Sequence, residues 1–120
     1  MTLLITVAAI ALPGGCNDRA CVERVAMHNC DHGHVGACIH RAALHHRVSE
    51  SWMRSIAWCE SRFRPWARNS SGHKGLFQYD DATWAAGPYA RRGSPFSAKW
   101  SSLQTAWYLR RGEASRWACA

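Results

Sequence analysis

The chain has 120 residues, enough for one domain with a real core, and 48% hydrophobic residues with seven tryptophans exclude a disordered protein. The net charge of +7 suits either nucleic acid or an anionic cell wall as partner. Because the basic residues are scattered and no recognised nucleic-acid motif occurs, we expect no nucleic-acid partner.

The N-terminal segment is apolar and short. Residues 3–12 form an uncharged run of ten residues, followed by Pro-Gly-Gly and Cys16. This run is too short to span a bilayer and predicts a signal peptide over 1–15, although no Lys or Arg precedes it. A mis-assigned start codon or a buried N-terminal segment is the alternative. The sequence before Cys16 loosely resembles a lipoprotein processing site, which makes Cys16 a candidate lipid anchor; past residue 20 no segment is a candidate membrane span.

A cysteine- and histidine-rich extension follows over 16–37, where we expect loops and at most short helix. Six cysteines suit an oxidising compartment, and they stand at 16, 21, 30, 38, 59 and 119. A zinc site deserves weighing because histidines gather nearby, at positions 28, 32, 34, 40, 45 and 46. No paired-ligand spacing such as Cys-x-x-Cys occurs, so we expect oxidised cysteines and neither metal nor cofactor.

The first expected helices are 38–47 and 50–63, with Ser49 as N-cap of the second and Pro65 marking its end. The predicted apolar face of the second helix consists of Trp52, Ile56, Cys59 and Phe63. On this helix Glu60 lies at the flank of the face, near Met53, and Arg62 points roughly the opposite way.

The C-terminal half predicts shorter elements. Residues 68–78 are rich in turn residues and predict a loop or small hairpin. Asp80 or Asp81 can cap a short helix over 82–86, and Ser97 can cap a longer helix through residue 111. A last turn carries Trp117 and Cys119. The expected fold is therefore all-α, or α+β at most if the hairpin forms.

The stretch around Glu60 carries the most specific motif. Cys59-Glu60-Ser61 is followed by Phe63, Pro65 and Ala67 at offsets three, five and seven from the glutamate, by Gly72 at twelve, and by Gly75-Leu76-Phe77-Gln78 at fifteen to eighteen. These residues in this register resemble the Glu-Ser signature of soluble lytic transglycosylases and of the related resuscitation-promoting factors, which are lysozyme-like enzymes that cut cell-wall glycan strands. The resemblance covers roughly residues 38–119 and implies a lysozyme-like domain over 38–120.

The resemblance implies that Glu60 is the catalytic acid/base, with its pKa raised by desolvation. On position alone, a solvated helix glutamate paired with an arginine would be the ordinary interpretation. A second acid would favour hydrolysis, and Asp80 and Asp81 are the candidates, although helix capping also explains them.

Further residues are expected to bind substrate on the same resemblance. They are Ser61, Gly75, Leu76, Phe77, Gln78, Tyr79, Thr83 and Trp84. Packing within the domain is the alternative for Ser61 and Thr83. Aromatic rings flanking the motif could also stack on sugars, namely Trp66, Tyr79, Trp84 and Tyr89, whereas Trp52, Trp100 and Trp107 are expected in the core.

The resemblance also implies a disulfide between Cys59 and Cys119, because the resuscitation-promoting factors carry such a pair. The other four cysteines allow three pairings that the sequence does not separate.

The expected function is a peptidoglycan lytic transglycosylase, a secreted or cell-envelope-associated monomer that acts on peptidoglycan glycan strands and leaves 1,6-anhydro ends. A muramidase-type hydrolase is the first alternative. A non-catalytic wall-binding module, held by its basic surface and aromatic groove, is the second.

Overall fold

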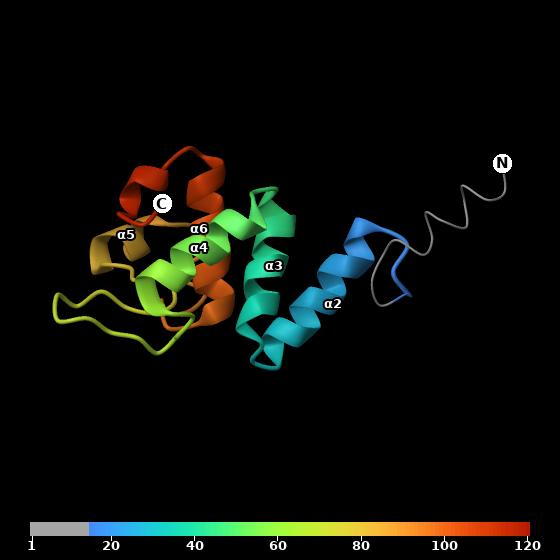
Figure 1. Cartoon of the computed structure of the whole chain (residues 1–120), viewed down its shortest axis with the longest axis horizontal. Helices are drawn as coiled ribbons and strands as arrows, with labels where there is room; N and C mark the ends of the chain where they lie inside the picture. Colours follow the sequence, from blue (N-terminus) through green and yellow to red (C-terminus); the bar gives the residue numbers. More distant parts are fainter. Residues whose placement is uncertain (1–14) are drawn as a thin grey trace, which may run out of the picture.

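The computed structural model describes residues 15–120 (Figure 1). The signal peptide predicted over 1–15 therefore lies outside the described residues, apart from Gly15.

The described part of the chain is all-α, which confirms the expected fold class. Its helices are α2 (Arg19–Asp31), α3 (Val35–His46), α4 (Glu50–Ser61), α5 (Asp81–Ala86) and α6 (Ala98–Arg110), followed by the short 3-10 turn η2 (Ala114–Arg116). The predicted hairpin is reduced to two isolated bridges, between Arg68 and Lys74 and between Lys74 and Tyr79. No strand occurs in residues 15–120.

Side-chain caps fix where the helices begin. Ser49 accepts a hydrogen bond from the backbone N–H of Trp52, and Ser97 does the same for Trp100, as predicted. At α5 the cap is Asp80, which accepts from the Thr83 N–H, and Asp81 is the first helical residue.

Helix α4 ends two residues earlier than expected. Arg62 and Phe63 adopt left-handed backbone conformations with φ of +55° and +61°, so the helix closes at Ser61, before Pro65 is reached.

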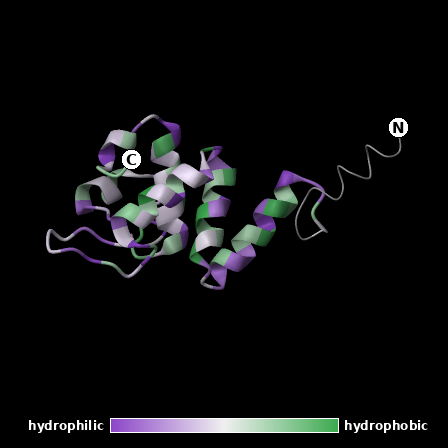
Figure 2. Ribbon diagram, in the orientation of Figure 1, coloured by the Kyte–Doolittle hydropathy of each residue, from purple (hydrophilic) through white to green (hydrophobic). Residues whose placement is uncertain are grey.

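The expectation of loops over 16–37 is wrong, because most of this segment is α2. Asp18 caps the helix by accepting from the Cys21 N–H, and no glycine lies within Arg19–Asp31. The glycines fall in and after the turn between α2 and α3, at Gly33 and Gly36, where they do not interrupt either the cap or the body of α2. Figure 2 shows hydrophobic and hydrophilic residues interleaved around α2 and α3.

The buried face of α4 differs from the predicted one. Met53, Ile56 and Ala57 are fully buried, whereas Trp52, expected in the core, is 37% exposed. The packing face is thus turned toward Met53 and Ala57 and away from Trp52 and Cys59. Glu60 continues the buried face, because Met53, Ala57 and Glu60 are spaced i, i+4 and i+7. This places the carboxyl group at the end of an apolar row.

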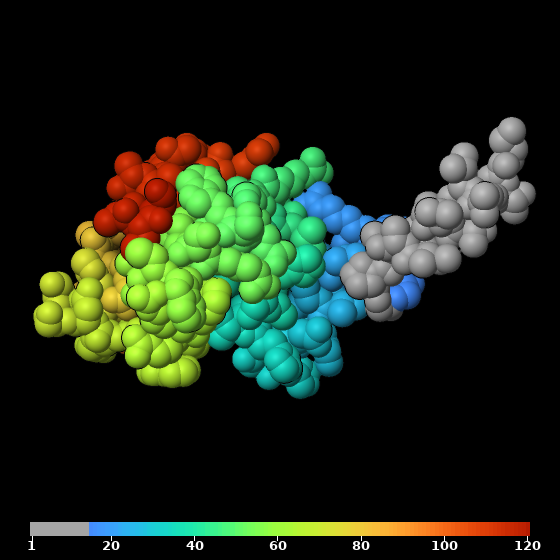
Figure 3. Space-filling view, in the orientation of Figure 1, coloured from blue at the N-terminus to red at the C-terminus, as the bar shows by residue number. Residues whose placement is uncertain are grey.

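Helix α6 forms the centre of the molecule. Residues 101–106 and 108–109 are buried, and α3 packs against this helix; in Figure 3 the residues of α4 cover most of it from view. Trp100 and Trp107 of α6, both expected in the core, are partly buried and pack against the core. The buried polar side chains of α6 are partly satisfied within the core: Thr105 Oγ1 lies 2.8 Å from the Tyr79 hydroxyl, and Gln104 donates to the Trp84 carbonyl oxygen at 2.8 Å. These bonds tie α6 to the segment that follows the Gly-Leu-Phe-Gln motif.

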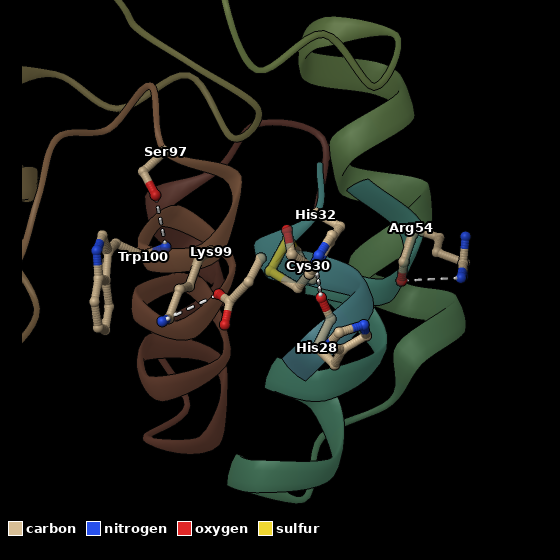
Figure 4. Close-up of a disulfide and its surroundings, with 10 residues drawn as sticks. His28, Cys30, His32, Arg54, Ser97, Lys99 and Trp100 are labelled. Carbon is tan, nitrogen blue, oxygen red and sulfur yellow. Dashed lines mark hydrogen bonds and ion pairs between the residues drawn. A yellow bond between two sulfur atoms is a disulfide. The ribbon is translucent and has the colours of Figure 1, made fainter. Parts of the chain in front are cut away.

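Three disulfides stabilise the fold. Cys59 pairs with Cys119, the pair that the resemblance implied, and the remaining cysteines pair as Cys16–Cys21 and Cys30–Cys38. Cys30–Cys38 joins α2 to α3, and Figure 4 shows it near the start of α6, where Lys99 forms a 3.3 Å ion pair with Asp31. Because the sulfur of Cys16 is bonded to Cys21, it cannot also carry a lipid, which corrects the expectation of a lipid anchor at Cys16.

Candidate active site

The last turn of α4 carries the candidate acid, Glu60. Its side chain is half-buried at the C-terminal end of the apolar row through Met53 and Ala57. Desolvation raises the pKa of the Glu60 carboxyl above its usual range, and this effect outweighs the backbone N–H of Cys119 and the charge of His73, which both lower it. A raised pKa keeps more of the carboxyl in the protonated form, as proton donation requires.

No ion pair holds this carboxyl within residues 15–120. The nearest arginine in sequence, Arg62, places its guanidinium 4.9 Å from the centre of the Trp58 ring instead. The ordinary alternative for a surface glutamate, pairing with an arginine, therefore does not hold in the described part of the chain.

A small polar pocket of about 50 Å³ lies close to Glu60. Its walls are His73, Gln78, Tyr79, Asp80, Thr83, Arg116 and Trp117. His73 acts on both the candidate acid and the pocket, because its charge lowers the pKa of Glu60 and of the pocket residue Asp80. The disulfide of Cys59 with Cys119 brings the C-terminal turn, and with it Arg116 and Trp117, to the same place.

Ser61 fastens the end of α4 to the Gly-Leu-Phe-Gln segment. It is buried, and its hydroxyl lies 3.1 Å from the Ala57 carbonyl oxygen and 2.8 Å from that of Leu76. It also accepts a hydrogen bond from the Arg64 N–H at 3.2 Å. Ser61 therefore positions the motif around Glu60 and does not face solvent.

Gly75 is needed for close packing. A Cβ atom added there would lie 1.9 Å from the carbonyl oxygen of Pro95, and the residue has a φ of +84°. Gly75 therefore lets this segment pack closely against the backbone of Pro95.

Most of the expected substrate-binding side chains are enclosed in the protein. Ser61, Gly75, Leu76, Phe77, Tyr79 and Trp84 are buried, so contact between these side chains and a glycan is not proposed. Gln78 and Thr83 are half-exposed and line the small pocket. Tyr79 also lines this pocket, and the other buried members pack behind it: the Trp117 indole N–H, for example, donates to the Phe77 carbonyl oxygen at 2.8 Å.

The expected aromatic groove is also reduced. Tyr79 and Trp84 pack against each other in the core, with ring centres 5.0 Å apart. Tyr89 places its hydroxyl 2.8 Å from His46 Nε2. Only Trp66 among the four candidates is well exposed, at 71%.

The two candidate second acids differ in their surroundings. Asp80 lines the pocket, and the hydrogen bond from the Thr83 N–H lowers the pKa of its carboxyl. At a pH between the two pKa values, Asp80 is therefore ionised while Glu60 is protonated. Asp81 pairs with Lys74 at 2.7 Å and is mostly exposed. Of the two, Asp80 is the one that lines the pocket together with His73.

Two pocket residues were not singled out from the sequence. His73 falls between the motif positions Gly72 and Gly75, and Arg116 lies in the C-terminal turn, far away in sequence. Only the predicted Cys59–Cys119 disulfide signalled that the C-terminal turn would reach this site. Among residues 15–120, no group of three or more His, Cys, Asp and Glu side chains is arranged to hold a metal ion.

Comparison with protein families matches the Transglycosylase SLT domain over residues 37–101. Comparisons with curated proteins and with solved structures found no match. The helical fold and the matched motif define the lysozyme-like class of proteins. Within that class, the chain belongs to the Transglycosylase SLT domain family.

Membership of this family implies lytic-transglycosylase-type activity on peptidoglycan. A disulfide-rich domain of this kind agrees with a location outside the cytoplasm, at the cell wall. None of the helices in the described residues is long and apolar enough to cross a membrane. The matched residues begin within α3, so α2 is an addition to the part of the chain that matches the family.

Proposed function

We propose that the protein is a lytic transglycosylase that cleaves the β-1,4 bond between N-acetylmuramic acid and N-acetylglucosamine with Glu60 as its single catalytic acid/base. The observation that carries the proposal is the half-buried Glu60 carboxyl, raised in pKa by desolvation and without an arginine partner in residues 15–120. Family membership supports the class of reaction and its substrate.

In this mechanism Glu60 first donates its proton to the bridging oxygen as the bond from C1 of the muramic acid breaks. The resulting carboxylate then accepts the proton of the muramic acid 6-hydroxyl, whose oxygen forms the new bond to C1. The proton is thereby returned to Glu60, and the product carries a 1,6-anhydro end. A single carboxyl group suffices because the nucleophile belongs to the substrate, whereas hydrolytic glycosidases ordinarily use two.

Hydrolysis is the second candidate, and Asp80 is the observation that favours it. This carboxylate is ionised and lines the pocket close to Glu60. One of its oxygens accepts from the Thr83 N–H at 2.6 Å, and in a hydrolytic reaction this carboxylate would hold the attacking water. An Asp80→Asn substitution that abolishes reducing-end products would support this second candidate.

The proposal is tested by replacing Glu60 with glutamine, which retains the shape of the side chain but cannot donate a proton to the leaving oxygen. We expect the Glu60→Gln variant to cleave purified peptidoglycan about 10²–10⁴ times more slowly than the unmodified protein. Asp31→Asn is the matched control, because it also removes one carboxylate, in this case an exposed one on α2, and we expect it to leave the rate unchanged.

Unchanged clearing by the Glu60→Gln variant would contradict the proposal and favour the wall-binding module. Loss of both peptidoglycan binding and activity would instead indicate a misfolded variant. A thermal melt and a pull-down with insoluble peptidoglycan distinguish these outcomes.

We further propose that the protein is exported. The apolar run over 3–12 and the three disulfides support export, because such bridges persist in oxidising compartments.

A further inference from the structure

His73 is a residue of the pocket to which the proposed mechanism assigns no role. It lies in the loop closed by the Arg68–Lys74 bridge and is half-buried. It lines the same small pocket as Gln78 and Asp80. A ring held at this place can contact a substituent of the sugar bound beside the acid.

Hydrogen bonds within the loop fix which nitrogen of His73 faces outward as a donor. Asn69 Oδ1 accepts from two backbone N–H groups, those of Ser71 and His73, each at 2.9 Å. This sets the orientation of the Asn69 amide, so its Nδ2 is the atom that lies 3.2 Å from His73 Nδ1. Because Nδ2 can only donate, Nδ1 must accept, and the proton of the neutral ring is therefore on Nε2. The free edge of the ring thus presents an N–H donor.

Gln78 presents the opposite group. Its Nε2 donates to the carbonyl oxygens of Ala67 at 3.2 Å and Gly75 at 3.0 Å. Both hydrogens of the amide are then used, and Oε1 has no hydrogen-bond partner among residues 15–120. The side chain therefore offers an acceptor in the pocket that His73 lines.

The charged groups of the pocket already have partners within the protein. Asp80 caps α5 through the Thr83 N–H, and Arg116 pairs with Glu113 at 2.8 Å. A neutral ligand group that needs one donor and one acceptor is therefore favoured over an anion. A secondary amide has this pattern, and a pocket of about 50 Å³ suits a small substituent.

We propose that His73 is a specificity-determining residue that recognises a 2-acetamido group of the glycan, with its Nε2–H donating to the acetamido oxygen while Gln78 Oε1 accepts from the acetamido N–H. The proposal rests on the proposed function, because it assigns a sugar-binding role to the pocket beside Glu60. In this proposal His73 contacts the ligand, whereas the buried residues of the motif hold the pocket in shape.

The test measures binding in the Glu60→Gln background, so that no probe is cleaved. The probes are tri-N-acetylchitotriose, which carries acetamido groups, and cellotriose, a neutral trimer with hydroxyl groups in their place. His73→Ala should weaken chitotriose binding about tenfold, the value of roughly one hydrogen bond. His73→Gln, whose Nε2 takes the place of the imidazole Nε2, should stay within about threefold of the parent. His73→Asn, whose amide reaches only the Nδ1 position, should resemble His73→Ala.

Cellotriose affinity should be weaker than that of chitotriose and the same in all four proteins. Equal chitotriose affinity for the parent and His73→Ala, or no chitotriose binding by the parent, would overturn the proposal. Nitrogen-15 spectra of the imidazole give a second readout, with Nε2 protonated and Nδ1 unprotonated in the neutral ring; the reverse tautomer would also overturn it. Failure of the proposed function would appear separately, as absence of cleavage by the unmodified protein.

Discussion

At the scale of single residues, the electrostatics of Glu60 depend on where α4 ends. The apolar row through Met53 and Ala57 extends to Glu60, and the helix closes one residue later because Arg62 is left-handed. The carboxyl group is thereby placed against packed side chains, and Arg62 stacks on Trp58 instead of neutralising it. The same geometry that raises the pKa of Glu60 also makes the ionised form costly for the fold.

This cost predicts a pH-dependent effect of Glu60→Gln on stability. In the folded protein Glu60 has a raised pKa, so its contribution to stability is fully present below the usual pKa of a glutamate and is lost as pH rises through the raised value. Glutamine does not ionise. We therefore expect Glu60→Gln to melt at a higher temperature than the unmodified protein at neutral pH, with the difference closing below about pH 4.

Thermal melts of both proteins across this pH range check the prediction. A variant that is less stable at neutral pH and equally stable in acid would show that the carboxylate is stabilised in the fold, contrary to the account.

At the scale of elements, the loop between α4 and α5 contains two glycines with the same backbone conformation and different surroundings. Gly72 and Gly75 both have a φ of +84°. A Cβ atom at Gly72 would meet nothing within 4 Å, whereas at Gly75 it would meet the Pro95 carbonyl oxygen at 1.9 Å. The pair therefore separates the cost of a left-handed conformation from the cost of a clash.

We expect Gly72→Ala to lower the free energy of unfolding by about 1–2 kcal/mol, the penalty of a left-handed alanine. Gly75→Ala should cost several kcal/mol more, because the Pro95 backbone must move, and it should also displace the Gly-Leu-Phe-Gln segment that Ser61 holds. Urea denaturation of the two variants measures the difference. Equal losses would mean that the loop adjusts freely and does not depend on contact with Pro95.

The elements that the sequence predicted are those with local signals. Ser49, Ser97 and the aspartates before α5 are caps whose hydrogen bonds involve neighbouring residues, so the helices they start could be predicted. Helix α2 was missed because its cysteines and histidines suggested loops, although Asp18 is an ordinary cap. Trp52 was expected in the core because periodicity gives a helical face but not which flank of that face is buried.

The candidate site was predictable to a similar extent. The motif register pointed to Glu60 as the candidate acid, and the family resemblance predicted the Cys59–Cys119 disulfide, which the structure contains. The motif did not show which of its side chains are buried, since burial depends on tertiary contacts such as those of Ser61 with Leu76 and of Tyr79 with Thr105. His73 has no signal in the motif, and the role proposed for it depends on a bond to Asn69 formed only in the folded loop.

At the scale of the whole molecule, one long-range disulfide connects the candidate acid to the C-terminus. Cys59 and Cys119 are 60 residues apart in sequence, and the Cys119 backbone N–H contributes to the electrostatics of Glu60. The Cys16–Cys21 bridge closes a loop of five residues at the far end of the described chain. Removing one bridge or the other should therefore have different effects on the stability and the activity of the protein.

Replacing Cys59 and Cys119 with serine should cost about 4 kcal/mol of unfolding free energy, on the chain-entropy model, and reduce activity because the C-terminal turn is released from the site. Replacing Cys16 and Cys21 should cost about 2 kcal/mol and leave activity unchanged in the folded protein. Denaturation curves and peptidoglycan cleavage of the two double variants check this. Equal activity of both variants under folding conditions would show that the C-terminal turn does not support the site.

The central claim is that one carboxyl group transfers the glycan to the substrate's own hydroxyl. It is tested most directly by digesting purified peptidoglycan in water enriched in oxygen-18 and analysing the released muropeptides by mass spectrometry. The account predicts muropeptides with anhydro ends, lighter by one water than the hydrolysed species and free of label. Reducing ends carrying oxygen-18 would contradict it, because they would show that water, held by a second group such as Asp80, is the nucleophile.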